Sequence, residues 1–257
     1  MKTIGIIANL NKPDAIVALQ RLSRKAHALD LRLAAFEEVA QTMGGAAADL
    51  NTVMDEIDVL LAMGGDGTML RAVRELKGRD KPVIGVNLGS LGYMTSVPLE
   101  NLERALECFA KGEFTYTERA IAECVITRDG HSPVTYRALN DLVVSSLSRR
   151  IINLTMTVDT EEVGDYVCDG LIVSTPTGST GHALSAGGPV LFPTTRVLVV
   201  TSICPHTLST RPLVVSDGST IRIGVAARSE AQLTADGQVG QVLAEGDKIE
   251  IRRSRQG

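Results

Sequence analysis

The chain has 257 residues, of which 44% are hydrophobic and 3% aromatic, and its formal net charge is −4. A chain of this size and hydrophobicity can bury a large core, which excludes an intrinsically disordered protein. The acidic balance and the few aromatic side chains argue against a nucleic acid or an anionic membrane as a partner. Four cysteines without CxxC spacing argue against zinc and are typical of a reducing compartment. No apolar run reaches the ~18 residues that span a bilayer, so we expect a cytoplasmic protein.

The first 115 residues alternate between strand and helix patterns. Short apolar runs typical of buried strands occur at Ile4–Ala8, Leu31–Phe36, Val59–Met63 and Val83–Asn87. Helical spacing follows three of these runs, with apolar faces at Ile16, Leu19, Leu22 and Ala26, at Met69, Ala72, Val73 and Leu76, and at Leu102, Ala105, Leu106 and Phe109. Gly112 is a natural stop for the last helix. Repeated β-α-β units predict an α/β domain over residues 1–115, with helices covering a parallel sheet.

A glycine-rich loop joins the third of these strands to its helix. Residues 63–68 read Met-Gly-Gly-Asp-Gly-Thr. Backbone N–H groups are unpaired at such a turn, and the positive end of the helix dipole favours an anion such as phosphate. The negative charge of Asp66 suits this place if the side chain takes a proton or holds a cation beside the phosphate. The loop therefore indicates phosphoryl transfer, although an aspartate before a glycine can also form an Asx turn or a helix cap.

From about residue 116 the pattern changes to β-branched runs that are separated by turns. The runs occur at Leu142–Val144, Asn153–Val158, Leu171–Ser174, Val197–Thr201, Leu213–Val215 and Ile221–Val225. Asp-Gly pairs at 129–130, 217–218 and 236–237 mark turns. We therefore expect residues 116–257 to form a second domain of mostly antiparallel β structure.

The densest group of polar residues follows the run that ends at Ser174. Residues 175–189 are rich in Ser, Thr and Gly, which are too polar and too flexible for a core element. Their hydroxyls and backbone N–H groups suit a polyhydroxylated or phosphorylated ligand. Ser179 and His182 do not form the G-x-S-x-G elbow of a nucleophilic serine, so we do not expect nucleophilic catalysis here.

Together, these segments resemble the NAD kinase family, whose members use ATP or polyphosphate to make NADP. The matching segments occur in the family's order, at Gly64–Thr68, Gly85–Gly92, Asn140-Asp141, Asp169-Gly170, Pro176–Thr180, Ser185–Pro189, Pro205–Pro212 and Asp236–Gln238. The first segment alone is also similar to diacylglycerol kinases and phosphofructokinases, and the resemblance implies a first domain of that kind. Two segments differ, because the family usually has Asn-Glu at 140–141 and Ala-Tyr at 181–182.

The resemblance implies a kinase that phosphorylates the adenosine 2′-hydroxyl of NAD. The donor would be ATP, another nucleoside triphosphate or polyphosphate, with a divalent cation. Asp66 would be the catalytic residue, which takes the proton from that hydroxyl or orients it. The phosphates of ATP would be bound by Gly64, Gly65, Gly67, Thr68 and Arg71. Thr68 is also a possible N-cap, and Arg71 equally fits a solvated helix face. No dedicated metal cage is expected, so Mg²⁺ would be carried on the ATP phosphates.

The resemblance also implies the residues that bind NAD, which are Asp66, Gly67, Asn140, Asp141, Arg150, Asp169, Thr177, Thr180, Gly181, His182, Ser185 and Gln238. A short amide and a carboxyl group can bind vicinal hydroxyls as donor and acceptor. Asp169 would contact the nicotinamide side of NAD in the same pocket as Thr177 and its neighbours. Family members form homodimers and homotetramers, and Arg150 would meet the ligand from a neighbouring subunit.

Two alternatives stay open. One is a non-catalytic NAD(P)-binding regulator that has lost turnover through the change at His182. The other is a related kinase with a lipid or sugar acceptor, against which the polar loop at 177–189 argues.

Overall fold

The computed structural model describes residues 1–44, 49–89, 92–148, 150–226 and 230–256. The chain forms two compact units, Met1–Thr117 and Glu118–Gly257, whereas the sequence pattern placed the boundary between residues 115 and 116. Ser90 and Leu91, which belong to the predicted segment Gly85–Gly92, lie outside the described residues. In the part of the chain that is described, no helix is long and apolar enough to cross a membrane.

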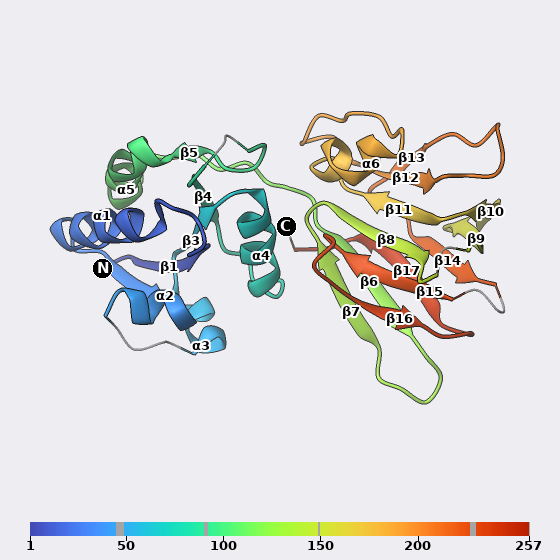
Figure 1. Ribbon diagram of the computed structural model, residues 1–257, viewed down its shortest axis with the longest axis horizontal. Coiled ribbons are helices and arrows are strands. Elements are labelled where there is room, and N and C mark those ends of the chain that lie inside the picture. Colours follow the sequence, from blue (N-terminus) through green and yellow to red (C-terminus); the bar gives the residue numbers. More distant parts are fainter. Residues whose placement is uncertain (45–48, 90–91, 149, 227–229, 257) are drawn as a thin grey trace. The chain divides into compact units, whose positions relative to one another are not determined.

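The first unit alternates strands and helices (Figure 1). Its elements are β1 (Thr3–Ala8), α1 (Ala15–Ala28), β2 (Arg32–Ala35), α2 (Glu37–Thr42), α3 (Leu50–Glu56), β3 (Val59–Gly64), α4 (Asp66–Glu75), β4 (Val83–Asn87), β5 (Val97–Pro98), a 3-10 turn (Leu99–Asn101) and α5 (Leu102–Lys111). The four apolar runs of the sequence thus form strands β1 to β4. The predicted stop of the last helix is confirmed, because Gly112 adopts a φ of 76° at the C-cap of α5.

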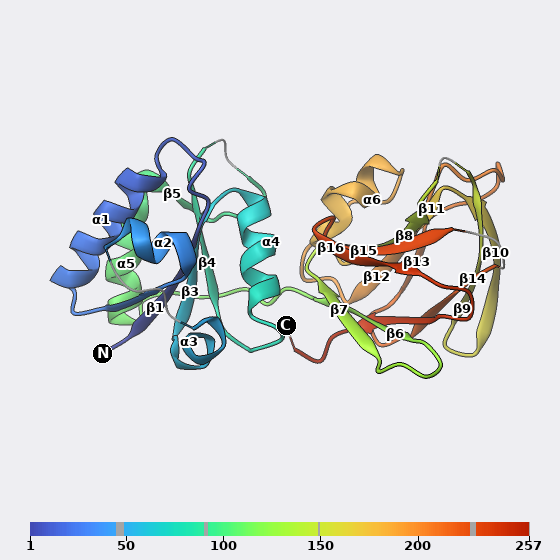
Figure 2. The ribbon, with the colours of Figure 1, turned by 60° about the horizontal axis from the view of Figure 1, so that its bottom comes forward.

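The sheet of the first unit is parallel throughout and has the strand order β2-β1-β3-β4-β5, which confirms the predicted α/β architecture. Apolar residues of α1 and α5 pack on one face of the sheet, and those of α3 and α4 pack on the other. Figure 2 shows α1 and α5 on one side of β3 and β4, and α4 on the opposite side. The carboxyl ends of β1, β3 and β4 therefore meet at one edge of the sheet.

One helix face differs from the prediction. Ile16 is 54% exposed, although its spacing placed it with Leu19 on the inner face of α1. Ala15 and Ala18 are fully buried instead. Asp14 is the N-cap, so Pro13 precedes the helix rather than occupying its first turn. The buried stripe therefore passes through the two alanines.

The second unit consists almost entirely of strands. Its elements are β6 (Ala122–Thr127), β7 (Val134–Ala138), β8 (Asp141–Ser146), β9 (Ile152–Val158), β10 (Glu161–Cys168), β11 (Gly170–Ser174), a 3-10 turn (Gly178–Thr180), α6 (His182–Ser185), β12 (Val197–Ile203), β13 (Leu213–Ser216), β14 (Ile221–Val225), β15 (Ala231–Ala235), β16 (Val239–Leu243) and β17 (Lys248–Arg253). All strand pairs described in this unit are antiparallel, which confirms the predicted β architecture.

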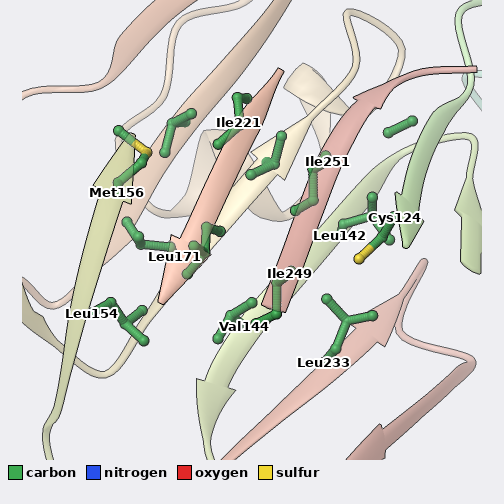
Figure 3. Packing of buried hydrophobic residues seen from close by; sticks show 14 of the residues in the cluster. Cys124, Leu142, Val144, Leu154, Met156, Leu171, Ile221, Leu233, Ile249 and Ile251 are labelled. Atoms are coloured by element: carbon green, nitrogen blue, oxygen red, sulfur yellow. The ribbon is translucent and has the colours of Figure 1, made fainter. Parts of the chain in front are cut away.

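Two six-stranded sheets enclose one apolar core in this unit. The sheet orders are β10-β9-β14-β17-β6-β7 and β13-β12-β11-β8-β15-β16. Figure 3 shows the core side chains between the strands, with Met156 from β9 and Ile251 from β17 on the first sheet and Leu171 from β11 on the second. Alternation along each strand places one set of side chains in this core and the other set outside it. The outer face of the second sheet carries the polar segment that follows β11.

Candidate active site

The loop from Gly64 to Thr68 joins β3 to α4. Gly65 stands at the N-cap position of α4, so Asp66 and Thr68 both lie inside the helix and neither is its N-cap. Gly64 must be a glycine, because an added Cβ would overlap the Oγ1 atom of Thr68. At Gly65 and Gly67, by contrast, an added Cβ would meet nothing within 4 Å. The space over these two residues is open, which is what a phosphate group approaching the backbone requires.

Asp66 contacts the segment that follows β4. The backbone N–H of Tyr93 donates to Oδ2 of Asp66 at 2.9 Å, and that of Met94 donates to Oδ1 at 3.0 Å. Gly92 leaves room for this carboxylate, because an added Cβ there would overlap Oδ1. Each carboxylate oxygen can accept a second hydrogen bond. The half-buried side chain is therefore held in one orientation and keeps acceptor capacity for a ligand.

Arg71 lies on the exposed face of α4. It lies five residues beyond Asp66 in α4, and its predicted role in phosphate binding stays a prediction.

In the second unit, Asn140 and Thr177 each bury a polar atom without a protein partner. Among the described residues, no group hydrogen-bonds to Oδ1 of Asn140 or to Oγ1 of Thr177. Gly178 packs directly against the backbone of Asn140, and an added Cβ would overlap its carbonyl oxygen. The N–H of Thr175 donates to that oxygen at 2.9 Å. Buried polar atoms without a partner are uncommon, so these two are candidates for hydrogen bonds to a ligand.

Asp236 was predicted as part of a turn and of the matching segment at 236–238, without a role of its own. In the structure it fixes the segment that contains Asn140 and Asp141. Its Oδ2 accepts from the N–H of Leu139 at 3.0 Å, and its Oδ1 accepts from those of Asn140 at 2.7 Å and Asp141 at 3.2 Å. Asp236 itself adopts a φ of 52° in the turn between β15 and β16. The Asp-Gly pair and the matching segment at 236–238 mark this residue in the sequence, but neither specifies this role. Gln238 follows in the same turn, where its side chain is exposed.

Asp141 is a buried carboxyl group. Asp141 is only 5% exposed to solvent. The pKa of its carboxyl group is raised to about 7, first by burial and second by the nearby carboxylate of Asp236, which acts in the same direction. The folded protein therefore keeps a proton on Asp141 at pH values where an unfolded chain has lost it. A protonated carboxyl group can donate a hydrogen bond as well as accept one.

We expect Asp141→Asn to change how stability depends on pH. In the wild type, the contribution of Asp141 to the free energy of unfolding should fall as the pH rises from about 4 to about 7, because the unfolded group titrates near 3.8 and the folded one near 7. The variant lacks this contribution, so its stability relative to the wild type should increase over that range. Urea denaturation at several pH values measures the difference, and a constant difference would contradict the raised pKa.

The segment after Thr177 contains four more of the residues that were predicted to bind NAD. Thr180 is half-buried, whereas Gly181, His182 and Ser185 are exposed at and within α6. Ser179 is fully buried, with its hydroxyl donating to the carbonyl of Pro176 at 2.7 Å. This structural hydroxyl supports the rejection of a nucleophilic serine.

Asp169 and Thr177, which the resemblance places in one pocket, lie on either side of β11. Asp169 precedes β11, and the loop with Thr177 follows it, so the two lie at opposite ends of a strand that spans ~16 Å. The carbonyl of Asp169 accepts from the N–H of Ser146 at 3.0 Å, at the end of β8 from which the loop with Arg150 leaves. Asp169 and Arg150 thus belong to one end of the sheet, and Asn140, Thr177 and Gln238 belong to the other. Sequence order could not show this separation.

No group of three or more His, Cys, Asp or Glu side chains suited to a metal ion occurs within the described ranges. The only carboxylate in the loop between β3 and α4 is that of Asp66.

Comparison with known proteins identifies both units. The ATP-NAD kinase N-terminal domain family matches residues 4–114, and the ATP-NAD kinase C-terminal domain family matches residues 139–257. The chain is 42% identical to the NAD kinase of Syntrophotalea carbinolica, over 99% of this chain and 90% of that protein. It is 38% identical to the NAD kinase of Heliobacterium modesticaldum, over 99% of this chain and 91% of that protein.

Two solved structures are similar over the whole chain. Yeast NADH kinase in complex with NADH has a TM-score of 0.91 at 25% identity, covering 100% of this chain and 82% of that one. An NAD kinase from Archaeoglobus fulgidus in complex with ATP has a TM-score of 0.79 at 29% identity, covering 100% and 91%.

Proposed function

Because the chain belongs to the NAD kinase family, we propose that it phosphorylates the adenosine 2′-hydroxyl of NAD, with ATP as the donor and a divalent cation as cofactor. The observation that carries the proposal is the placement of Asp66. Its carboxylate is held by two backbone N–H groups beside glycines that leave the backbone open. A fixed carboxylate next to an open phosphate-binding loop is the arrangement that transfer to a hydroxyl requires.

Each part of this loop has a proposed task. The open backbone at Gly65 and Gly67 binds donor phosphates, and the dipole of α4 favours their negative charge. Asp66 accepts a hydrogen bond from the 2′-hydroxyl, which orients the attacking oxygen. As the 2′-oxygen bonds to the γ-phosphorus, the bond from that phosphorus to the β,γ-bridging oxygen breaks and ADP leaves, while the proton of the hydroxyl passes to the carboxylate. Positioning supplies most of the acceleration, because the transition state of phosphoryl transfer is loose.

The residues of the loop fit a magnesium ion that is carried mainly by the substrate. Mg²⁺ is usually bound by one or two carboxylates together with substrate phosphates. Asp66 is the carboxylate available here, and its oxygens keep acceptor capacity. When bound, the ion would neutralise charge on the triphosphate.

For NAD, we propose that Asn140, Asp141 and Thr177 bind the sugar hydroxyls. The unpartnered Oδ1 of Asn140 and the unpartnered Oγ1 of Thr177 support this assignment. Asp169 and Arg150 lie at the other end of the sheet, so we propose that they contact NAD bound to a second copy of the chain in a homodimer or homotetramer. A cytoplasmic location belongs to the same proposal.

The test is the formation of NADP from NAD or NADH, with ATP and polyphosphate supplied in turn. Formation of NADP labelled at the 2′-phosphate from γ-labelled ATP supports the proposal. Binding of NAD in calorimetry without NADP from any donor would favour a non-catalytic regulator. Transfer of label to lipid or sugar acceptors, but not to NAD, would favour the other kinase alternative.

A further inference from the structure

Lys12 lies in the loop that follows β1, at the edge of the sheet that also holds the loop with Asp66. Its Nζ is 3.4 Å from the position that a Cβ on Gly89 would occupy. Gly89 follows β4, and β1 and β4 flank β3 on opposite sides. Strands two places apart are separated by about 10 Å, so the lysine side chain reaches across the carboxyl end of β3. The ammonium group therefore lies beside the segment that follows β4, at the same edge of the sheet where β3 continues into Gly64 and Gly65.

No described residue accepts a hydrogen bond from the Nζ of Lys12. Two other lysines of this unit illustrate the contrast. Lys2 donates to the carbonyl of Phe109 at 2.7 Å, and Lys81 donates to the carbonyl of Ile57 at 2.9 Å. Lys12 is half-buried, and no carboxylate among the described residues forms an ion pair with it. An anion at this place would supply a counter-charge.

The backbone opposite Lys12 is fixed in advance. Asn87 is 7% exposed, its Oδ1 accepts from the N–H of Gly89 at 3.1 Å, and its Nδ2 donates to the carbonyl of Gly89 at 3.1 Å. The N–H of Leu88 donates to the carbonyl of Gly64 at 3.0 Å, which joins this segment to the glycine loop. A ligand would meet a pre-organised backbone here rather than one that has to be ordered on binding.

The topology of the sheet points to the same place. The chain runs from β1 to β2 on one side and then returns to β3 on the other, so the crevice between β1 and β3 is the topological switch point. Ligands of open parallel sheets bind outside the carboxyl ends of the strands at such a point. Lys12 follows β1 and the loop beginning at Gly64 follows β3, so both segments leave the sheet at this switch point.

We propose that Lys12 binds the phosphate chain of the phosphoryl donor, together with the backbone of the glycine loop. The identification of this anion as a donor triphosphate rests on the proposed function. An ammonium group on a flexible stem is a point charge that can follow a phosphate as charge moves during transfer. Lys12 thus contributes to the binding of the donor and not to the binding of NAD.

The test compares Lys12→Met with Lys111→Met. Lys111 is the last residue of α5 and lies near the amino edge of the sheet, where Lys2 contacts Ala110. Lys111→Met therefore removes one positive charge from the same unit at a place far from Lys12. We expect Lys12→Met to raise the KM for ATP at least ~10-fold and to leave the KM for NAD within about twofold. Lys12→Arg should recover most of the loss, and Lys111→Met should behave as the wild type. A KM for ATP within about twofold of the wild type in Lys12→Met would overturn the proposal.

A binding measurement separates this inference from the proposed function. Titration calorimetry with inorganic tripolyphosphate needs no turnover and no NAD. Weaker binding to Lys12→Met, but not to Lys111→Met, would support the phosphate site even if no NADP were formed. Equal binding to the wild type and both variants would overturn it even in an active kinase.

Discussion

Asp66→Asn should lower turnover at least ~10²-fold while changing the affinity for NAD by no more than several-fold. The amide has nearly the same size but cannot take a proton from the 2′-hydroxyl. It also loses one acceptor, because an amide nitrogen cannot accept from the N–H of Tyr93 or Met94. Initial rates of NADP formation give the turnover, and calorimetry gives the affinity for NAD.

The loss of a backbone contact needs its own control. Asp58 precedes β3 at the amino edge of the same sheet, and its Oδ2 accepts from the N–H of Thr3 at 2.7 Å. Asp58→Asn therefore weakens a comparable contact far from the glycine loop and should leave turnover close to that of the wild type. Thermal unfolding should first show that the Asp66→Asn protein is folded. If its turnover number is then within about threefold of the wild-type value, Asp66 neither takes the proton nor orients the hydroxyl.

The sequence predicts the elements whose hydrophobic pattern is strong. Apolar runs such as Val59–Met63 have few alternatives to a buried parallel strand, and they form β1 to β4. Strands such as β10, β16 and β17 were not predicted. They carry charged or small residues on their outer face, as Glu161–Cys168 does, so local composition alone does not mark them.

The parts of the site that depend on tertiary structure were harder to predict from the sequence. The glycine loop is contiguous, and its role follows from local chemistry. The contacts of Asp236 join it to residues 95 to 97 positions away in the sequence, and no local pattern reports such a distance. The separation of Asp169 from Thr177 was missed for a related reason, since residues close in sequence can lie at opposite ends of a strand. Lys12 was not predicted as a site residue, because only the order of the strands in the sheet brings it near Gly89, and that order is not visible in the sequence.

Asp236→Ala should destabilise the protein by about 3–4 kcal/mol and weaken NAD binding more than ~10-fold. The variant leaves three partly buried N–H groups without their acceptor, at residues 139, 140 and 141. Alanine also adopts the φ of 52° less readily than aspartate does. Because Asn140 and Asp141 lose their backbone anchor, the candidate NAD ligands should no longer be held in place. Urea denaturation measures the stability, and calorimetry measures the affinity for NAD.

Two further variants, Asp159→Ala and Asp236→Asn, distinguish the positioning of the NAD ligands by Asp236 from a general loss of stability. Asp159 adopts a similar φ of 55° and accepts from one N–H, that of Thr220 at 2.9 Å. Asp159→Ala should therefore cost about 1 kcal/mol and leave NAD affinity unchanged. Asp236→Asn keeps one oxygen for Asn140 and should recover part of both losses. Both substitutions at 236 remove a negative charge, so the pKa of Asp141 should move down from about 7. An Asp236→Ala protein that binds NAD as tightly as the wild type would show that the anchor does not position these ligands.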